Sequence, residues 1–322
     1  MFFSIITPCV GHSVLKRLIE SLNSQTIKDF EHVIVIDGNQ YNDNVDKILN
    51  DIEPEGYERY IIRLPKNTGK EGGWFCGHRI YAGVTHFVNG DYLCFLDEDN
   101  FYDRDHLENY YNLIKNNDLE WCFSLRNIVD IDGKFICKDN CESLGYLHHA
   151  FYNNNIYFID TSCTCIRREI AIETSYKLHR KCFNNDGDSD RIFSRTLMEN
   201  YPKYMCTKKH TVNYLVEEDK PNSVKKELFI NGNNLIKNWY NGQIPWENGK
   251  EIHIVFIDPI NTVNLIKNIY EGNINIDIKG YYLSGYKPYM PKDSFIILYD
   301  GIIKNTPKHI KRNDVSIVKF ML

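Results

Sequence analysis

The chain has 322 residues, of which 43% are hydrophobic and 25% are charged, and this composition suits a folded protein with a sizeable core. Its formal net charge of −5 excludes the broadly basic surface that general nucleic-acid binding requires. The sequence holds no run of 18 apolar residues, so we expect no transmembrane segment.

The first hundred residues alternate between short apolar runs and segments in which apolar residues recur at helical spacing. The strands expected in this part cover residues 2–7, 30–37, 59–64 and 92–96. The helices expected between them cover residues 13–25, 45–52 and 74–88. The strands are continuously apolar, which is typical of strands buried on both faces. The sequence therefore predicts an α/β fold with a mostly parallel central sheet and helices on both faces.

The pattern changes after a helix expected at residues 105–116. Two strands, 121–129 and 134–138, flank the turn signal Asp132-Gly133 and predict a hairpin. Two more strands are expected at 156–167 and 211–216, and two more helices at 169–178 and 191–200. These elements complete a first domain that we place at residues 1–216.

The rest of the chain divides into two parts. Residues 217–249 are rich in Asn, Gly, Pro and charge, and predict a linker or a surface helix. Residues 250–322 predict a small C-terminal α/β unit, near the lower end of domain size. Its expected elements are a helix at 264–270 and strands at 251–258, 276–283, 294–300 and 316–321.

Three adjacent carboxylates, Asp97, Glu98 and Asp99, follow the apolar run 92–96 directly. Like charges beside an apolar core are costly unless they have partners. In open α/β sheets, ligands bind beyond the carboxyl ends of the strands. A D-x-D sequence at such an end can bind a hard divalent cation through oxygen ligands, and the cation can neutralise a departing diphosphate. The alternative is that these residues belong to an ordinary loop or helix cap.

Several motifs occur in a fixed order along residues 1 to about 215. They are a first strand ending in Thr7-Pro8, "SLNSQT", "DFE", a second strand ending in Asp37, "NTG" and "GDYLCFLDED". This order resembles the catalytic domain of family 2 glycosyltransferases, which have the GT-A fold. The sequence departs from the family in having Gly38 where many members have a second acidic residue.

The resemblance implies a nucleotide-sugar site and a metal site. The residues implied to bind the nucleotide sugar are Thr7, Pro8, Asp37, Asn67, Arg79, Asp97 and Glu98. The residues implied to bind Mn²⁺ or Mg²⁺ are Asp99 and Asp97, with His210 added from a later segment.

Three of these assignments have a structural alternative of their own. Asp37 precedes Gly38 and could be a turn residue, Arg79 could be a solvated helix residue with His78 as its rival, and a lone histidine such as His210 is more often structural.

A second acidic cluster places Asp186, Asp188 and Asp190 at alternate positions. It is not a calcium loop, because Arg191 stands where that loop needs glycine and Leu197 stands where it needs glutamate. Two interpretations remain. The carboxylates could cap the following helix, or, as the resemblance implies, one of them is the general base for the acceptor hydroxyl. We favour Asp190 over Asp188, because Asp190 opens the helix and the helix N-terminus would keep it ionised.

These observations predict a metal-dependent, inverting glycosyltransferase. It would move a sugar from a nucleotide-diphosphate donor, most readily a UDP-sugar, to a hydroxyl of a carbohydrate or glycoconjugate acceptor. One alternative is a sugar nucleotidyltransferase, which normally opens with a Gly-rich basic loop that "TPCVGHSVLKR" does not match. A second is a non-catalytic module that binds a sugar or a nucleotide without turnover.

Two further features of the sequence predict the cellular compartment of the protein. The N-terminus lacks the basic start of a signal peptide, and the ten cysteines read as free thiols of a reducing compartment. We therefore expect a cytoplasmic protein, soluble or peripheral to a membrane. The C-terminal unit would orient an acceptor or pair subunits, and the sequence leaves both open.

Overall fold

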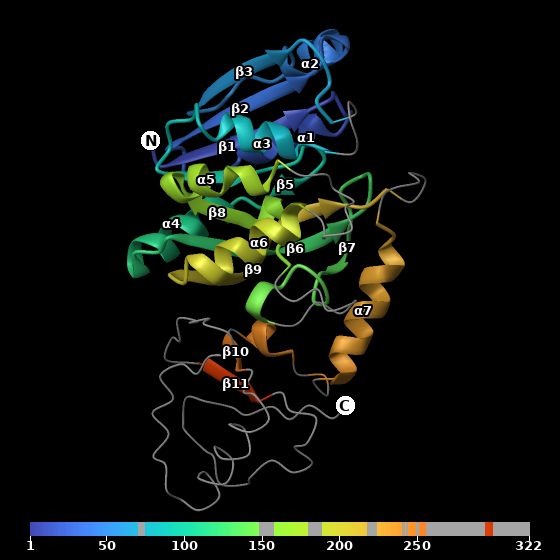
Figure 1. Cartoon of the computed structure of the whole chain (residues 1–322). Coiled ribbons are helices and arrows are strands. Elements are labelled where there is room, and N and C mark those ends of the chain that lie inside the picture. The colour runs from blue at the N-terminus through green and yellow to red at the C-terminus, as the bar shows by residue number, and fades with distance from the viewer. Residues whose placement is uncertain are drawn as a thin grey trace, which may run out of the picture.

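The computed structural model describes residues 1–69, 75–147, 158–179, 189–217, 224–239, 242, 244–248, 251–255 and 294–298. These residues form one large mixed sheet and a separate two-stranded sheet (Figure 1). The large sheet has the strand order β3-β2-β1-β4-β8-β6-β9-β5, and β7 pairs with β6 at the side of this path.

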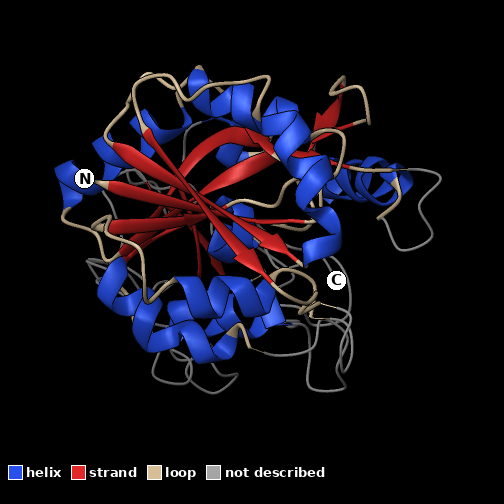
Figure 2. Ribbon diagram, turned by 90° about the horizontal axis from the view of Figure 1, so that it is seen from above, coloured by secondary structure: helices blue, strands red, loops and turns tan. Residues whose placement is uncertain are grey.

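The first half of the sheet is parallel. Its strands are β1 (Phe3–Cys9), β2 (Phe30–Asp37), β3 (Glu58–Leu64) and β4 (Tyr92–Phe95). Helices α1 (Leu15–Asn23), α2 (Asn42–Leu49) and α3 (His78–Val84) and the short 3-10 helix η1 (Asn39–Tyr41) connect them. Helices lie on both faces of the sheet (Figure 2), which is why β1 and β2 are buried along their whole length. The predicted strand and helix order is confirmed here.

Helix α3 is shorter than the predicted 74–88, because the chain turns sharply just before it. Cys76 has a left-handed φ of 49°, and Gly77 precedes the first helical residue. A Cβ at Gly77 would lie 2.6 Å from Cγ of Pro8, so only glycine lets the start of α3 approach the end of β1 this closely.

The second half of the sheet is mixed. It contains β5 (Phe101–Tyr102), β6 (Trp121–Val129), β7 (Phe135–Lys138), β8 (Thr164–Arg167) and β9 (Tyr204–Leu215). Its helical elements are α4 (His106–Asn117), η2 (Gly145–Leu147), η3 (Thr161–Cys163), α5 (Arg168–Thr174), η4 (Ser175–Lys177) and α6 (Ser189–Asn200). Strands β6 and β9 are parallel, whereas β8 is antiparallel to both β4 and β6.

The strand predicted at 156–167 was wrong in its described part, because only its last four residues form β8. Asp160 stops the extended chain: its side chain accepts a hydrogen bond from the backbone N–H of Ser162 and opens η3. A side-chain acceptor that satisfies an orphan N–H in this way favours a helical turn over a strand.

The segment expected to be a linker or a surface helix contains α7 (Lys226–Trp239) and η5 (Pro245–Asn248). Phe229, Ile236 and Trp246 are buried in the main core, and the Trp246 Nε1–H donates to Asn140 Oδ1 at 2.7 Å. This segment therefore packs against the first domain.

In the C-terminal part, β10 (Glu251–Val255) pairs in parallel with β11 (Ser294–Leu298). Both lie within strands predicted there. The helix predicted at 264–270 and the strands predicted at 276–283 and 316–321 lie outside the described residues. None of the described helices is both long enough and apolar enough to cross a bilayer.

Candidate active site

The carboxyl ends of the main strands meet at one edge of the sheet. Strand β4 is parallel to β1 and β1 is parallel to β2, so Asp37 and the acidic strand end, Asp97 to Asp99, lie at this edge. Because β8 is antiparallel to both β4 and β6, β6 runs in the same direction as β4 and ends there too. This is the edge at which α/β sheets bind ligands.

Asp97 joins three elements. Its Oδ1 accepts a hydrogen bond from the Tyr81 hydroxyl of α3 at 2.7 Å, and its Oδ2 contacts the Ser162 hydroxyl of η3 at 3.4 Å. Burial, followed by the negative charge of Asp160, raises the pKa of Asp97 from 3.8 to about 6. The side chain is thus fixed in position, while its negative charge is held in an unfavourable environment.

Glu98, which was predicted to bind the nucleotide sugar, contacts the loop after β1. Its two oxygens accept hydrogen bonds from the backbone N–H groups of Val10, Gly11 and His12, each at 3.0 Å. The Cys9 thiol also donates to it, at 3.1 Å. Both oxygens are therefore used to hold the loop after β1 against the acidic strand end.

Asp37 organises the loop that carries Asn67. Its carboxylate accepts hydrogen bonds from the backbone N–H of Thr68 at 2.7 Å and of Gly69 at 3.3 Å, while the Asn67 amide donates to the Asp37 carbonyl at 3.0 Å. Arg79 reaches the same loop, donating to the Thr68 carbonyl at 3.3 Å and stacking 3.4 Å over the Phe75 ring. The structure thus brings Asp37, Asn67 and Arg79 together.

Thr7 and Pro8 lie near the carboxyl end of β1 and are buried. Thr7 is wholly buried, and its hydroxyl pairs with Nε2 of His32 at 3.0 Å, so its side chain faces the sheet interior. Pro8 packs against Gly77 at the start of α3. Thr7 and Pro8 are buried because β1 is a central strand, covered by helices on both faces.

The start of α6 adjoins the acidic strand end. Ser189, the first residue of α6, contacts the His78 ring at the start of α3. Three residues after Asp190, the Phe193 ring packs edge-on against Phe95 of β4, with centroids 6.0 Å apart. Asp190 therefore lies on a helix that crosses the strand carrying the acidic end. Asp186 and Asp188 lie outside the described residues.

A buried ion network connects these elements, and the sequence did not reveal it. Arg126, at 1% exposure, donates to Asp139 at 2.8 Å, Asp160 at 2.5 Å and Glu142 at 2.8 Å. The other oxygen of Glu142 pairs with Arg191 at 3.2 Å. Through Asp160 the network extends to Asp97, whose pKa the charge of Asp160 raises. At its other end is Arg191, the residue that follows Asp190 in α6.

Burial and charge act in opposite directions in this network. Burial disfavours ionisation of Asp139, but the Arg126 guanidinium and backbone N–H donors outweigh it and keep the pKa of Asp139 below its usual value. Burial raises the pKa of Glu142 despite the opposing charge of Arg126. Arg126 is therefore the charge on which the ionised carboxylates around it depend.

His210 is not brought to the acidic strand end. It lies opposite Leu125 within β9, and its carbonyl accepts from the Asn127 amide at 3.0 Å. Burial, followed by the charge of Lys138, lowers the pKa of His210 to about 4. The charged groups that act on His210 are Lys138, Asp139 and Glu247. His210 lies five residues before Leu215, the last residue of β9.

A divalent cation at the acidic strand end stays a prediction. No cluster of three or more His, Cys, Asp or Glu side chains suited to a metal occurs in the described part of the chain. Mg²⁺ is commonly bound through one or two carboxylates plus substrate phosphates, so Asp97 and Asp99 are sufficient in kind. The raised pKa of Asp97 marks negative charge that a cation would stabilise. After burial, the charges of Asp160 and Asp99 also raise the pKa of the Tyr214 phenol.

Several residues of the site carried no signal in the sequence. Tyr81, Ser162 and Asp160 approach Asp97 only in the fold. Asn100 is the exception, since it follows the acidic run directly: its side chain bonds both Ser162, at 3.1 Å, and the backbone N–H of Leu215, at 3.1 Å.

The Asp97→Asn variant is expected to be more stable than the native protein near neutral pH in EDTA, by about 1–3 kcal/mol at about 1.4 kcal/mol per pKa unit. A carboxyl whose folded pKa is raised, here from 3.8 to about 6, stabilises the fold fully below 3.8, and that stability is lost as the pH rises through 6. Asparagine keeps an acceptor for Tyr81 and has a donor for Ser162.

Urea unfolding at about pH 4 and about pH 7.5 measures this effect, which should be largest at the higher pH. The exposed Asp51→Asn is the charge-matched control. A variant no more stable than the native protein at the higher pH would contradict the raised pKa of Asp97.

Comparison with known proteins identifies relatives in sequence. A family model described as glycosyl transferase family 2 matches residues 4–174, just over half of the chain. The amylovoran biosynthesis glycosyltransferase AmsB of Erwinia amylovora is 28% identical over 240 residues, covering 70% of this chain and 75% of that protein. An uncharacterized glycosyltransferase of Methanocaldococcus jannaschii is 27% identical over 123 residues, covering 38% of this chain and 40% of that protein.

Two solved structures share the fold. A crystal structure of TarS from S. aureus superposes with a TM-score of 0.50 at 17% identity, covering 67% of this chain and 60% of that chain. TarS in complex with UDP-GlcNAc gives a TM-score of 0.50 at 18% identity, covering 73% of this chain and 65% of that chain. This chain thus spans less than two thirds of the TarS chains that it matches. At these identities the likeness concerns the fold, and it confirms the predicted GT-A fold.

Proposed function

This chain belongs to glycosyl transferase family 2, and from that premise we propose that it transfers a sugar from a nucleotide-diphosphate donor to a hydroxyl of a carbohydrate or glycoconjugate acceptor. The observation that carries this proposal is the acidic strand end, Asp97 to Asp99, at the carboxyl edge of the sheet and inside the matched region. UDP-sugars are the first donors to test, since a protein of the same fold, TarS, was crystallised with UDP-GlcNAc.

The donor would lie between two groups of residues. Asp37 and the loop that it holds, with Asn67 and Arg79, would face the nucleoside and its diphosphate. The acidic strand end would face the diphosphate and the sugar. A divalent cation held by Asp99 and Asp97 would neutralise charge on the leaving nucleoside diphosphate.

The acceptor would be activated from α6. Asp190 would take the proton of the acceptor hydroxyl as the acceptor oxygen attacks the anomeric carbon. The bond from that carbon to the diphosphate oxygen breaks in the same step, so the configuration at the carbon inverts. The position of Asp190 in the first turn of α6 supports this role, because the positive end of the helix dipole stabilises an ionised carboxylate.

The donor site is tested by thermal unfolding with UDP, GDP, CDP and dTDP, each with and without Mn²⁺. We expect one nucleotide to raise the melting temperature of the native protein in a Mn²⁺-dependent way, because a ligand that binds only the folded state stabilises it. Asp99→Asn should abolish that shift, and Asp51→Asn, an exposed carboxylate far along the sequence, should keep it. If no nucleotide raises the melting temperature, the proposed donor is wrong. If Asp99→Asn keeps the shift as Asp51→Asn does, the nucleotide binds without Asp99.

A further inference from the structure

The two residues that flank Asp190 are both held by side chains of other elements. On one side, Ser189 contacts the His78 ring at the start of α3. On the other side, the Arg191 guanidinium pairs with Glu142 at 3.2 Å. The first turn of α6 is therefore fixed by two contacts, and neither of them uses the carboxylate of Asp190.

A carboxylate and an aromatic ring each bridge Arg191 and Arg126. Glu142 accepts a hydrogen bond from Arg191 through Oε1 at 3.2 Å and one from Arg126 through Oε2 at 2.8 Å. The centroid of the Phe158 ring lies 4.3 Å from the Arg191 guanidinium carbon and 5.7 Å from that of Arg126. A cation over an aromatic face is attracted by the ring, and more strongly where water is excluded. Arg191 is thus held by an ion pair and by a ring contact together.

The turn that carries Glu142 is shaped by a buried carboxylate. Asp139 is wholly buried and accepts hydrogen bonds from the backbone N–H groups of Cys141, Glu142 and Ser143, at 3.0, 2.9 and 3.0 Å. The Nε–H of Arg126 also donates to Asp139, at 2.8 Å. Because the backbone of this turn is fixed, Glu142 is already in place when it pairs with the guanidinium of α6.

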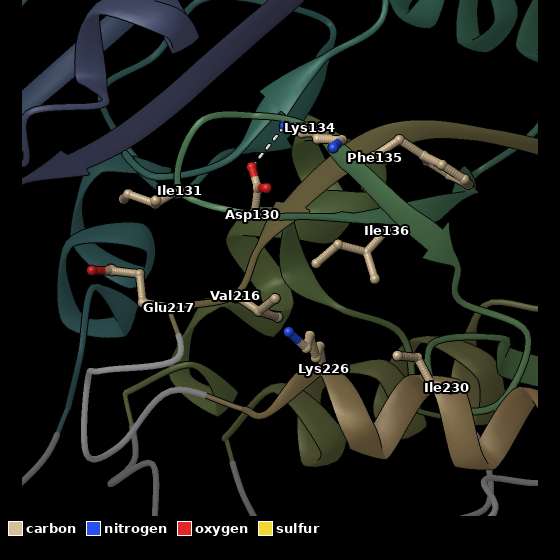
Figure 3. Close-up of a pocket in the computed structure, with 9 residues that line it drawn as sticks. All are labelled: Asp130, Ile131, Lys134, Phe135, Ile136, Val216, Glu217, Lys226 and Ile230. Atoms are coloured by element: carbon tan, nitrogen blue, oxygen red, sulfur yellow. Dashed lines mark hydrogen bonds between the residues drawn. The ribbon is translucent and has the colours of Figure 1, made fainter.

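Helix α7 has one side towards this network and another towards an open hollow of about 610 Å³ (Figure 3). Ile230 lines the hollow and is 37% exposed, whereas the preceding residue, Phe229, is wholly buried. The centroid of the Phe229 ring lies 5.3 Å from the Arg126 guanidinium carbon. Phe229 therefore keeps water from this part of the network, and ion pairs are stronger where water is excluded.

Both contacts that fix α6 lead to the same carboxylate on the donor side. The His78 ring lies near the Tyr81 ring, with centroids 6.3 Å apart, and the Tyr81 hydroxyl donates to Asp97 at 2.7 Å. The ion network reaches Asp160, which accepts the Ser162 N–H at 2.9 Å, and the Ser162 hydroxyl contacts Asp97 at 3.4 Å. The first turn of α6 and the acidic strand end are thus connected along two routes.

We propose that Arg191 is a positioning residue, which Glu142 and Phe158 hold so that Asp190 stays at a fixed distance from the donor bound at the acidic strand end. A base acts only within hydrogen-bond reach of the acceptor hydroxyl, and a displacement of about 1 Å can lower a rate by about 10²-fold. The proposal rests on the proposed function, because it assigns a role in the same reaction. Arg191 acts through Asp190 and touches neither substrate.

The test compares Arg191→Met with Arg195→Met. Arg195 is the matched control because it lies one turn later on α6, pairs with Glu199 and is 67% exposed. The rate is measured as the release of UDP from UDP-sugars, with water or alkyl glycosides as acceptor. Arg191→Met should lower kcat by about tenfold or more. The KM for the donor should change little, since the residues proposed to contact the donor lie on other elements. Arg195→Met should change neither quantity.

Two further variants distinguish positioning from a loss of folded protein. Arg191→Lys keeps the charge that pairs with Glu142, so it should recover most of the native kcat. Glu142→Gln should lower kcat as Arg191→Met does. The double variant should be no slower than either single variant, because two residues that act through one contact are not additive.

Hydrogen exchange of the whole chain without substrate gives a measurement that does not depend on turnover. Residues 189–197 should exchange about tenfold faster in Arg191→Met, the factor that about 1.4 kcal/mol represents, and as slowly as the native protein in Arg195→Met. The proposal is overturned if Arg191→Met keeps the native exchange in this segment or keeps the native kcat. If the native protein releases UDP from no UDP-sugar, the proposed donor is wrong, and the exchange result alone decides on Arg191.

Discussion

Replacing Asp190 with Asn is expected to lower kcat by about 10²- to 10⁴-fold, the range that positioned general bases contribute. Asparagine has nearly the same shape but cannot accept the proton of the acceptor hydroxyl at neutral pH. Nucleotide affinity should stay the same, since the residues proposed to contact the donor lie on other elements. The release of nucleoside diphosphate from a UDP-sugar, with water or a panel of alkyl glycosides as acceptor, measures the effect.

The competing interpretation is that Asp190 only caps α6. Its carboxylate does accept the backbone N–H of Arg191, at 2.8 Å. A lost cap would cost about 1 kcal/mol of folding stability and leave kcat nearly unchanged below the melting range. Asp43→Asn is the matched control, because Asp43 is an exposed carboxylate in the first turn of α2. If both variants keep similar rates, Asp190 is a capping residue and the base must be sought elsewhere.

Replacing Arg126 with Met is expected to lower the free energy of unfolding by about 3–5 kcal/mol. The substitution preserves much of the side-chain volume but leaves Asp139 and Asp160 buried without their counter-charge. Desolvated carboxylates that lose a positive partner must either stay charged at high cost or take up protons. Urea unfolding at neutral pH measures the change.

An exposed arginine gives the matched control. Arg63 pairs with Asp46 at 2.6 Å, but both side chains are about 40% exposed, so Arg63→Met should cost less than about 1 kcal/mol. A loss for Arg126→Met no larger than this would mean that the network carboxylates do not depend on Arg126. Because the network ends at Asp160 and Arg191, the Arg126 variant should also lose activity at temperatures where it remains folded.

The sequence by itself determined the order of the elements and the position of the acidic strand end. Strands β2 and β6 match their predicted boundaries, 30–37 and 121–129, residue for residue. Each of these segments is mostly apolar and is bounded by polar residues, and such a signal depends only on neighbours in the chain. The same holds for Asp97 to Asp99, which are visible because they interrupt an apolar run.

Only the tertiary structure decided what the polar side chains of the site touch. Glu98 binds a loop more than eighty residues away, Thr7 turns to His32, and Arg126 gathers Asp139 and Asp160. These contacts depend on which strands lie side by side, and strand order is not encoded in local periodicity. A buried charge must find its partner wherever the packed sheet places one, because leaving it alone in a medium of low polarity costs several kcal/mol.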